Sequence, residues 1–374
     1  MRSSKKGTSK SGAEGLRILL INPFGIGDVI FSTPLIEILK TRFPDSYLCF
    51  VCNKRTYDVI EKCPKLDKVY VFEKGDQKRL WRENKILSLK SFVEFTKQIK
   101  RERFDIAIDM SLGHQYSFFL KLIGVPQRVG FDYKGRGRFQ TAKLKFKGFD
   151  DKPIGEYYKD LLRLIDLDIY DAPSGIWFGS MDIEYIDNFF KEKRLYGKRV
   201  IGISPGGGIS FGKENIVFKR WPASSFAALS DKLMKEPGTE VVLMWGPGEE
   251  GLIDEIKGMM EGEPVIAPPT TIGQLAALMS QCDAVVCNDS GPLHIAAAAG
   301  ARTVSIFGPS DPNVYGPYPK SDKHIALKSG IDCSPCYRRF KIPKCGDLKC
   351  LGGIDYREVF EVVKSHARNE RISV

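Results

Sequence analysis

The sequence predicts an α/β fold of two Rossmann-like domains, and three observations support this prediction. The chain has 374 residues, more than the roughly 250–300 at which a single core usually stops growing. Short apolar runs alternate with amphipathic helical patterns, as in parallel sheets built from β-α-β units. Two such series begin near residues 16 and 200, each with a Gly-rich turn after its first strand. We therefore expect a disordered basic tail at 1–15, one domain at 16–175, a second at 176–354 and a final helix within 355–374.

The composition is that of a globular protein with a basic surface. Hydrophobic residues make up 43% of the chain and charged residues 28%. We find no run of about 20 apolar residues, so we expect no transmembrane helix. The polar start of the chain does not resemble a signal peptide, so a cytoplasmic location is the expectation. The 57 Lys and Arg residues exceed the 46 Asp and Glu residues, which indicates either an anionic partner or a feature for solubility.

The first domain opens with a strand at 16–21, a turn that contains Gly25 and Gly27, and a helix that ends near residue 43. This Gly-x-Gly lacks the third glycine of the dinucleotide fingerprint, so it gives little support for an NAD-dependent oxidoreductase. Asp28 either caps the helix, where the dipole favours a negative charge, or acts as a catalytic base at the carboxyl edge of the sheet. Further strands are expected at 47–51, 69–72, 106–108 and 128–131, and helices within 74–103, at 116–123 and at 156–167.

Residues 134–147 hold six basic side chains interleaved with apolar ones, which favours an exposed strand or loop. Such a mixture suits a nucleic-acid groove, a phosphorylated sugar or an anionic membrane surface. No zinc-finger, RRM or helix-turn-helix pattern accompanies it, so we expect no nucleic-acid partner. Asp166-x-Asp168 is a pair of the type that holds a divalent ion under a nucleotide-sugar pyrophosphate. It precedes a linker-like segment, and we interpret both residues as surface carboxylates.

The second domain is expected to place four Gly-rich or Pro-rich turns at one edge of a parallel sheet. They follow strands that end at Ser204, Met244, Cys287 and Phe307, and the carboxyl ends of parallel strands share one edge. The third turn leads into an alanine-rich helix, whose free amides and dipole favour a phosphate at its start. An ordinary βα turn is the alternative, but four turns at one edge indicate a ligand site. The strands are expected at 200–204, 241–244, 265–266, 284–287 and 303–307, and the helices at 182–194, 224–234, 272–281 and 294–299.

Four of the nine cysteines follow the pattern Cys333-x2-Cys336-x8-Cys345-x4-Cys350. This spacing is compatible with a small structural zinc site. Disulfides or free thiols are the alternatives. The other five cysteines lie in apolar runs and are expected to be small core residues.

As a set, the motifs resemble glycosyltransferase family 9, the ADP-heptose:lipopolysaccharide heptosyltransferases, and its heptosyltransferase II-like members in particular. The matching segments are NPFGIGDVIFSTP, SPGGG followed by KRWP, WGPGEE, NDSGPLHIAAAAG and FGPSDP, in the family's order. The resemblance implies a GT-B architecture, in which two Rossmann-like domains face each other across a cleft. The N-terminal domain would bind the acceptor and the C-terminal domain the nucleotide sugar.

The resemblance also implies a reaction. Heptose would be transferred with inversion from ADP-heptose to an anionic inner-core acceptor of lipopolysaccharide, with no metal or other cofactor required for catalysis. The protein would work in the cytoplasm, peripherally bound to the inner membrane that carries the lipid-linked acceptor. A GT-B enzyme with another donor sugar, or a nucleotide-sugar 2-epimerase, is the alternative.

The family's motifs assign roles to individual residues. Asp28 would be the catalytic base, and Lys219 would neutralise the departing phosphate, although the loop before it is longer than is usual in the family. Glu250 would hold the donor ribose, with Glu249 one residue away, and Thr270 would contact adenine. Gly25 and Gly27 would lie on the acceptor side. The other expected donor-binding residues are Ser204, Gly206, Gly207, Trp245, Gly246, Asp289, Ser290, Gly291, Pro292 and His294.

Overall fold

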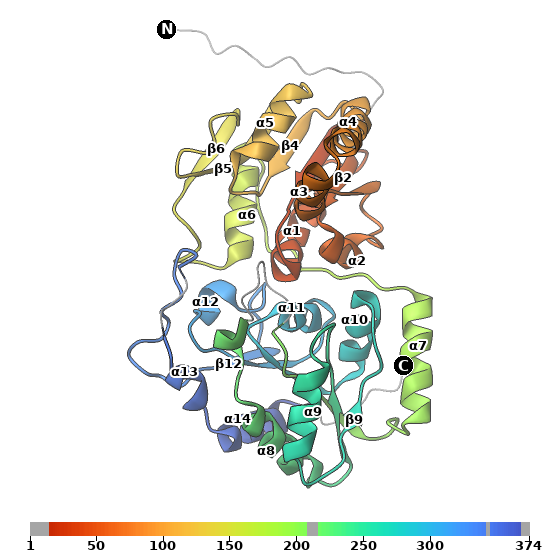
Figure 1. The fold of residues 1–374 in the computed structure, drawn as a ribbon, viewed down its shortest axis with the longest axis vertical. Helices are drawn as coiled ribbons and strands as arrows, with labels where there is room; N and C mark the ends of the chain where they lie inside the picture. The colour runs from red at the N-terminus through yellow and green to blue at the C-terminus, as the bar shows by residue number, and fades with distance from the viewer. Residues whose placement is uncertain (1–14, 208–215, 342–344, 368–374) are drawn as a thin grey trace.

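A computed structural model of the chain describes residues 15–207, 216–341 and 345–367. The chain forms two α/β domains, stacked one above the other in Figure 1. Each is built in the described part on a six-stranded parallel sheet, with strand orders β3-β2-β1-β4-β5-β6 and β12-β11-β10-β7-β8-β9. This confirms the predicted fold class. The predicted disordered tail lies almost wholly outside the described residues.

The N-terminal sheet is formed by apolar runs whose central members are buried on both faces, as expected for a sheet covered by helices on both sides. Helices α1 and α6 pack against each other on one face, and α1 also contacts α11 of the second domain, as α2 contacts α10. The strands are β1 (Arg17–Ile21), β2 (Tyr47–Cys52), β3 (Lys68–Val71), β4 (Ile106–Asp109), β5 (Gln127–Tyr133) and β6 (Ala142–Phe146). The helices are α1 (Ile26–Arg42), η1 (Lys54–Thr56), α2 (Tyr57–Ile60), α3 (Lys74–Glu83), α4 (Lys85–Arg101), α5 (His114–Leu122) and α6 (Ile154–Arg163).

The C-terminal sheet carries the turns that the sequence places at one edge, at the ends of β7, β8, β10 and β11. Its strands are β7 (Arg199–Ser204), β8 (Thr239–Leu243), β9 (Val265–Ile266), β10 (Ala284–Asn288), β11 (Thr303–Ile306) and β12 (His324–Leu327). Its helices are α7 (Ser180–Glu192), η2 (Ile216–Lys219), α8 (Ala223–Met234), α9 (Glu250–Met259), α10 (Ile272–Gln281), α11 (Gly291–Ala298), α12 (Pro312–Tyr315), α13 (Lys349–Gly352) and α14 (Tyr356–His366).

The two domains are packed directly on each other. One buried apolar cluster runs from α1, with Ile30 and Phe31, into α11, with Leu293 and Ile295. Residues 164–179 link α6 to α7 and contain the predicted boundary at 175 (Figure 1). Asp166 and Asp168 are exposed in this link, as the interpretation of surface carboxylates requires. Within the described ranges, no helix combines the length and the apolar character needed to cross a bilayer.

The last helix differs from the prediction. We expected residues 355–374 to pack back toward the N-terminal domain, but α14 packs against α8 and the strands β10 and β11 of its own domain (Figure 1). Val359, Phe360 and Val363 are buried there in the C-terminal core. The apolar side of the helix predicts burial but does not specify which domain supplies the partner surface. Helices α3 and α9 and the edge strand β12 were not predicted individually.

Candidate active site

Two helices start at the boundary between the domains, and their N-termini lie close together. Helix α1 begins at Ile26 after the N-cap residue Gly25, and α11 begins at Gly291 after Ser290. A Cβ atom placed on Gly291 would lie 3.4 Å from the Cβ of Ile26, so the two first turns are in contact. Because both dipoles carry their positive ends to this point, it favours an anion.

Asp28 lies in the first turn of α1, as the sequence predicts. Its Oδ2 accepts a hydrogen bond from the Gly25 amide at 3.3 Å, and its Oδ1 accepts one from the Tyr158 hydroxyl at 3.1 Å. Burial raises the pKa of the Asp28 carboxyl to about 6, opposed by the Tyr158 hydroxyl, the Gly25 amide and the positive charge of Lys219. The carboxylate is therefore ionised at neutral pH but more basic than usual, as suits a general base.

Lys219 lies in the opposite domain at the end of η2. Its Nζ donates to Oδ2 of Asp289 at 2.6 Å, and the Ser310 hydroxyl donates to the same oxygen. The ammonium also lies 5.6 Å and 5.5 Å from the ring centres of Tyr315 and Tyr337. Lys219 thus lies on the other domain from Asp28 but close enough to lower the pKa of that carboxyl. The longer loop before Lys219 does not remove it from the site.

Glu249 connects two of the glycine turns. Its Oε1 accepts from the Gly207 amide at 3.1 Å and its Oε2 from the Gly246 amide at 3.0 Å. A Cβ atom on Gly206 would lie 2.1 Å from both carboxylate oxygens of Glu249, so only glycine fits here without a shift of that carboxylate. Glu249 is the N-cap residue of α9 and is buried, whereas Glu250 begins the helix and is exposed. The structure therefore brings Glu249 rather than the predicted Glu250 into the site.

The side-chain amide of Asn288 joins two further segments of the site. Its Nδ2 donates to the carbonyl oxygens of Pro205 at 2.7 Å and Gly206 at 3.2 Å, and its Oδ1 accepts from the Trp221 amide at 3.0 Å. This buried side chain fixes the β7 turn beside the segment that carries Lys219. The remaining predicted donor residues lie at the same edge of the sheet: Ser204 at the end of β7, Trp245 and Gly246 after β8, Thr270 before α10, and Ser290, Gly291 and Pro292 at the start of α11.

His294 is the point where α11 meets α1. Its ring forms an edge-to-face contact with Phe31 at 4.6 Å between ring centres. A Cβ atom on Gly27 would lie 2.6 Å from its Cδ2, so only glycine allows this approach. Burial lowers the pKa of His294 to about 4, so the imidazole is neutral at physiological pH. Gly27 therefore has a packing role at the contact between the domains, in addition to the acceptor-side position expected for it.

Three residues of the site were not predicted, namely Tyr158, Asn288 and Ser310, and Glu249 was named only as the neighbour of Glu250. Tyr158 lies on α6, 130 residues from Asp28 in sequence, and no local signal marks it. Ser310 and Asn288 lie inside the quoted motifs FGPSDP and NDSGPLHIAAAAG. Those motifs could have suggested them.

The four cysteines of the predicted zinc site lie within described segments of the C-terminal domain. Cys333, Cys336, Cys345 and Cys350 are all unpaired thiols, and three of them are exposed. They are near enough to influence one another electrostatically, and burial and the neighbouring thiols raise the pKa of Cys350. Among the residues with described positions, no three His, Cys, Asp or Glu side chains are arranged to hold one ion. Structural zinc at this cluster stays a prediction.

The comparisons with known proteins agree with this geometry. The sequence profile of glycosyltransferase family 9 (heptosyltransferase) matches residues 92–345, more than half of the chain. The chain is 24% identical over 373 residues to lipooligosaccharide heptosyltransferase 2 of Campylobacter jejuni, covering 96% of this chain and 100% of that protein.

Two solved structures have the same fold. The glycosyl transferase of family 9 from Veillonella parvula superposes with a TM-score of 0.77 at 26% identity, covering 94% of this chain and 97% of the other. The ADP-heptose LPS heptosyltransferase II of E. coli superposes with a TM-score of 0.71 at 23% identity, covering 94% and 98%. The chain therefore belongs to glycosyltransferase family 9 (heptosyltransferase) and is a glycosyltransferase with the GT-B fold.

Proposed function

We propose that this enzyme transfers heptose from ADP-heptose to an anionic inner-core acceptor of lipopolysaccharide, with inversion at the anomeric carbon and without a catalytic metal. The observation that carries the proposal is the position of Asp28 on one domain, facing Lys219, Asp289 and the glycine turns on the other. Two of the relatives compared above support the choice of substrates, since they are named as a lipooligosaccharide heptosyltransferase and an ADP-heptose LPS heptosyltransferase.

In the proposed reaction, Asp28 takes the proton of an acceptor hydroxyl while that oxygen attacks the anomeric carbon of the donor. The bond from the anomeric carbon to the diphosphate oxygen breaks on the opposite face, so the configuration inverts. The leaving ADP carries the developing negative charge, which Lys219 and the amides at the start of α11 stabilise. The proton remains on Asp28 until water removes it.

The second domain provides residues that would bind the donor nucleotide. Glu249 is held between the Gly207 and Gly246 amides and is the carboxylate we assign to the donor ribose. Thr270 remains the expected contact for adenine. No step requires a divalent ion, because the charge of the leaving diphosphate is met by Lys219 and main-chain amides.

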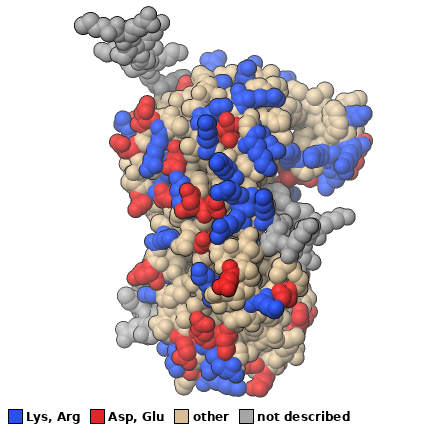
Figure 2. All heavy atoms as spheres, turned by 90° about the vertical axis from the view of Figure 1, so that its left-hand side faces the viewer, with Lys and Arg blue, Asp and Glu red and all other residues tan. Residues whose placement is uncertain are grey.

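The basic side of the N-terminal domain supports a peripheral position on an anionic membrane. Figure 2 shows Lys and Arg side chains gathered over this domain on the side that carries β5 and β6. Within this region, Lys134, Arg136, Arg138, Lys143, Lys145 and Lys147 are all exposed. Negatively charged lipids and the phosphates of a lipid-linked acceptor would both be attracted there.

Incubation with ADP-heptose and a deacylated inner-core oligosaccharide tests the proposal. We expect a heptosylated product whose new linkage is of opposite anomeric configuration to the donor, formed equally well with EDTA present. A panel of nucleotide sugars, compared by the rise in melting temperature, identifies the preferred donor. Epimerised donor formed without acceptor would favour the 2-epimerase, and elemental analysis of protein purified under reducing conditions tests the predicted zinc.

A further inference from the structure

A hairpin of the C-terminal domain, formed by residues 336–341, crosses to the N-terminal domain on the side away from the interdomain link. Its base is fixed by the Cys336 and Tyr337 amides, which donate to the Pro309 carbonyl oxygen at 2.8 Å and 2.7 Å. Its turn is closed by the Lys341 amide, which donates to the Arg338 carbonyl oxygen at 3.0 Å. Since Pro309 directly precedes Ser310, the hairpin is attached to the turn that positions Asp289.

The tip of the hairpin docks on the end of β6. The Phe340 ring lies 5.8 Å from Tyr133 and 5.5 Å from Phe149, in an aromatic pocket of the N-terminal domain. Arg339 forms an ion pair of 2.6 Å with Asp150. The hairpin therefore holds both domains and forms a wall between them, which Figure 1 shows as the blue segment that rises to meet the end of the β6 connection.

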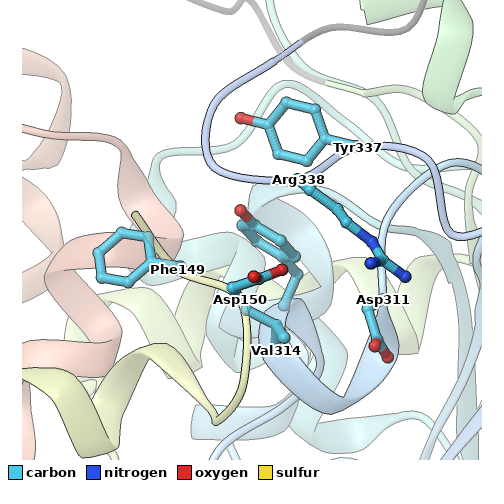
Figure 3. A pocket seen from close by; sticks show the side chains of 7 residues that line it. Phe149, Asp150, Asp311, Val314, Tyr337 and Arg338 are labelled. Carbon is cyan, nitrogen blue, oxygen red and sulfur yellow. The ribbon is translucent and has the colours of Figure 1, made fainter. Parts of the chain in front are cut away.

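Beneath this hairpin lies a cavity of about 180 Å³, formed by both domains. Figure 3 shows Phe149 and Asp150 on one side of it, with Arg338 and Asp311 on the other. The lining residues are Phe149, Asp150, Asp311, Val314, Tyr315, Tyr337 and Arg338.

The cavity adjoins the catalytic groups. Tyr315 and Tyr337 line it and are also the two rings next to the Lys219 ammonium. Burial, followed by the negative charges of Asp28 and Asp289, raises the pKa of the Tyr337 hydroxyl to about 12. A group bound in the cavity would therefore lie next to the two rings that contact Lys219, within electrostatic reach of Asp28.

Arg338 is the cation among the side chains that line the cavity, and Asp311 is a second carboxylate there that forms no ion pair with a described residue. Asp150 is paired with Arg339, and Asp311 caps α12 by accepting from the Asn313 amide at 2.9 Å. Arg338 is exposed and forms no salt bridge with any described residue. Its planar guanidinium can bind a carboxylate or phosphate through two parallel hydrogen bonds. Aromatic rings beside hydrogen-bonding groups are the lining expected for a small polar ligand such as a sugar ring.

We propose that this cavity is a subsite for an acidic sugar unit of the acceptor, and that Arg338 binds its carboxylate or phosphate. This rests on the proposed function, because it assumes that the acceptor enters between Asp28 and Lys219. The hairpin then determines acceptor specificity: Phe340 and Arg339 fix its position on the N-terminal domain, and Arg338 recognises the charge.

Steady-state kinetics of Arg338→Gln with the deacylated inner-core oligosaccharide tests this inference. We expect the acceptor KM to rise roughly tenfold or more, the usual cost of losing a charge-assisted hydrogen bond, with the donor KM unchanged. Arg357→Gln, which changes another exposed arginine on α14, serves as the control and should behave like the wild type. The same acceptor is also used after enzymatic dephosphorylation and, separately, after reduction of its carboxyl groups. The treatment that abolishes the difference between wild type and variant identifies the bound group.

The outcomes separate the two proposals. If the wild type does not transfer heptose, the proposed function fails. If the wild type transfers heptose but Arg338→Gln keeps its acceptor KM, or raises only the donor KM, the acceptor subsite is wrong while the proposed function stands. A difference that persists with both treated acceptors would also overturn the recognition of an anionic group.

Discussion

At the scale of single residues, the environment of Asp28 accounts for its proposed chemistry. A carboxylate in the first turn of a helix is ordinarily a capping group with a low pKa, because the dipole stabilises its charge. Here desolvation by burial outweighs these stabilising contacts and raises the pKa to about 6. The buried environment thus turns a capping residue into a base that works near neutral pH.

Asp28→Asn should lower turnover by about two to four orders of magnitude, the usual contribution of a general base. The same variant should be more stable than the wild type at pH 7.5. Because the folded pKa is raised, the stability contributed by the protonated carboxyl is present below about pH 4 and is lost as the pH rises through about 6. The loss is about 3 kcal/mol at most. Thermal unfolding at pH 7.5 and pH 4 measures it, and the gap between variant and wild type should close at the lower pH. A folded variant with wild-type turnover would remove Asp28 from the mechanism.

Tyr158→Phe should shift the acidic limb of kcat/KM to higher pH. The Tyr158 hydroxyl donates to the ionised Asp28 and lowers its pKa, so removing the donor leaves the carboxyl protonated at higher pH. Activity should recover toward the wild-type value above pH 8. Tyr157→Phe is a matched control on the same helix, since that hydroxyl pairs with Asp151 instead. An unshifted limb in the Tyr158 variant would argue against this hydrogen bond as the tuning contact.

At the scale of elements, the close approach of α1 and α11 defines the site. Two helix N-termini converge only because Gly27 has no side chain to meet the His294 ring. Both first turns then present free amides to the same space. The glycine is needed for packing between helices rather than for a turn.

Gly27→Ala should weaken this contact and lower activity. Its Cβ would lie 2.6 Å from His294 Cδ2, so the ring or the helix must shift, at a cost of about 1–3 kcal/mol for an overpacked contact. We expect a lower melting temperature and at least a tenfold loss of kcat/KM, because a shift of this size misplaces Asp28. Gly258→Ala on α9, where a Cβ meets no atom within 4 Å, should instead be neutral or slightly stabilising. Equal behaviour of the two variants would contradict this account.

At the scale of the whole molecule, the two domains divide the work. The C-terminal domain collects the turns of β7, β8, β10 and β11 at one edge, while the N-terminal domain provides Asp28 and the basic side. The strand β6 is at the edge of its sheet, with Lys143 and Lys145 facing outward and Phe146 buried. An anionic surface can therefore approach the N-terminal domain, the proposed acceptor domain, without covering the C-terminal domain.

Replacing Lys143, Lys145 and Lys147 together by Gln should weaken binding to vesicles that contain anionic lipid. Each basic residue near such a surface contributes about 1 kcal/mol, so the combined loss is on the order of a hundredfold at physiological ionic strength. Co-sedimentation with vesicles measures it, with neutral vesicles as the reference. The control replaces the exposed Lys191, Lys193 and Lys257 of the C-terminal domain. Transfer to the soluble deacylated acceptor should fall much less than vesicle binding, and equal vesicle binding by both triple variants would disprove a membrane-facing basic side.

The sequence by itself determined the local features. Alternating strands, glycine turns and helices were readable because hydrophobic periodicity and turn chemistry act over a few neighbouring residues. These features placed Asp28 and Asp289 in the turns that follow strands, with Lys219 and His294 nearby, and the order of the motifs indicated the family. Each of these residues lies at the interdomain site.

Only the tertiary structure decided what depends on contacts between distant segments. Consecutive residues of a helix point about 100° apart, so a shift of one residue in the start of α9 decides which glutamate faces the site. The sequence could not fix that start, whereas the structure makes Glu249 the N-cap residue and Glu250 the first helical residue. Tyr158 reaches Asp28, the hairpin reaches β6, and α14 stays in its own domain because of surfaces that meet only after folding. An apolar or polar pattern indicates that a side chain will be buried or hydrogen-bonded. The packing of the two domains determines which residue it contacts.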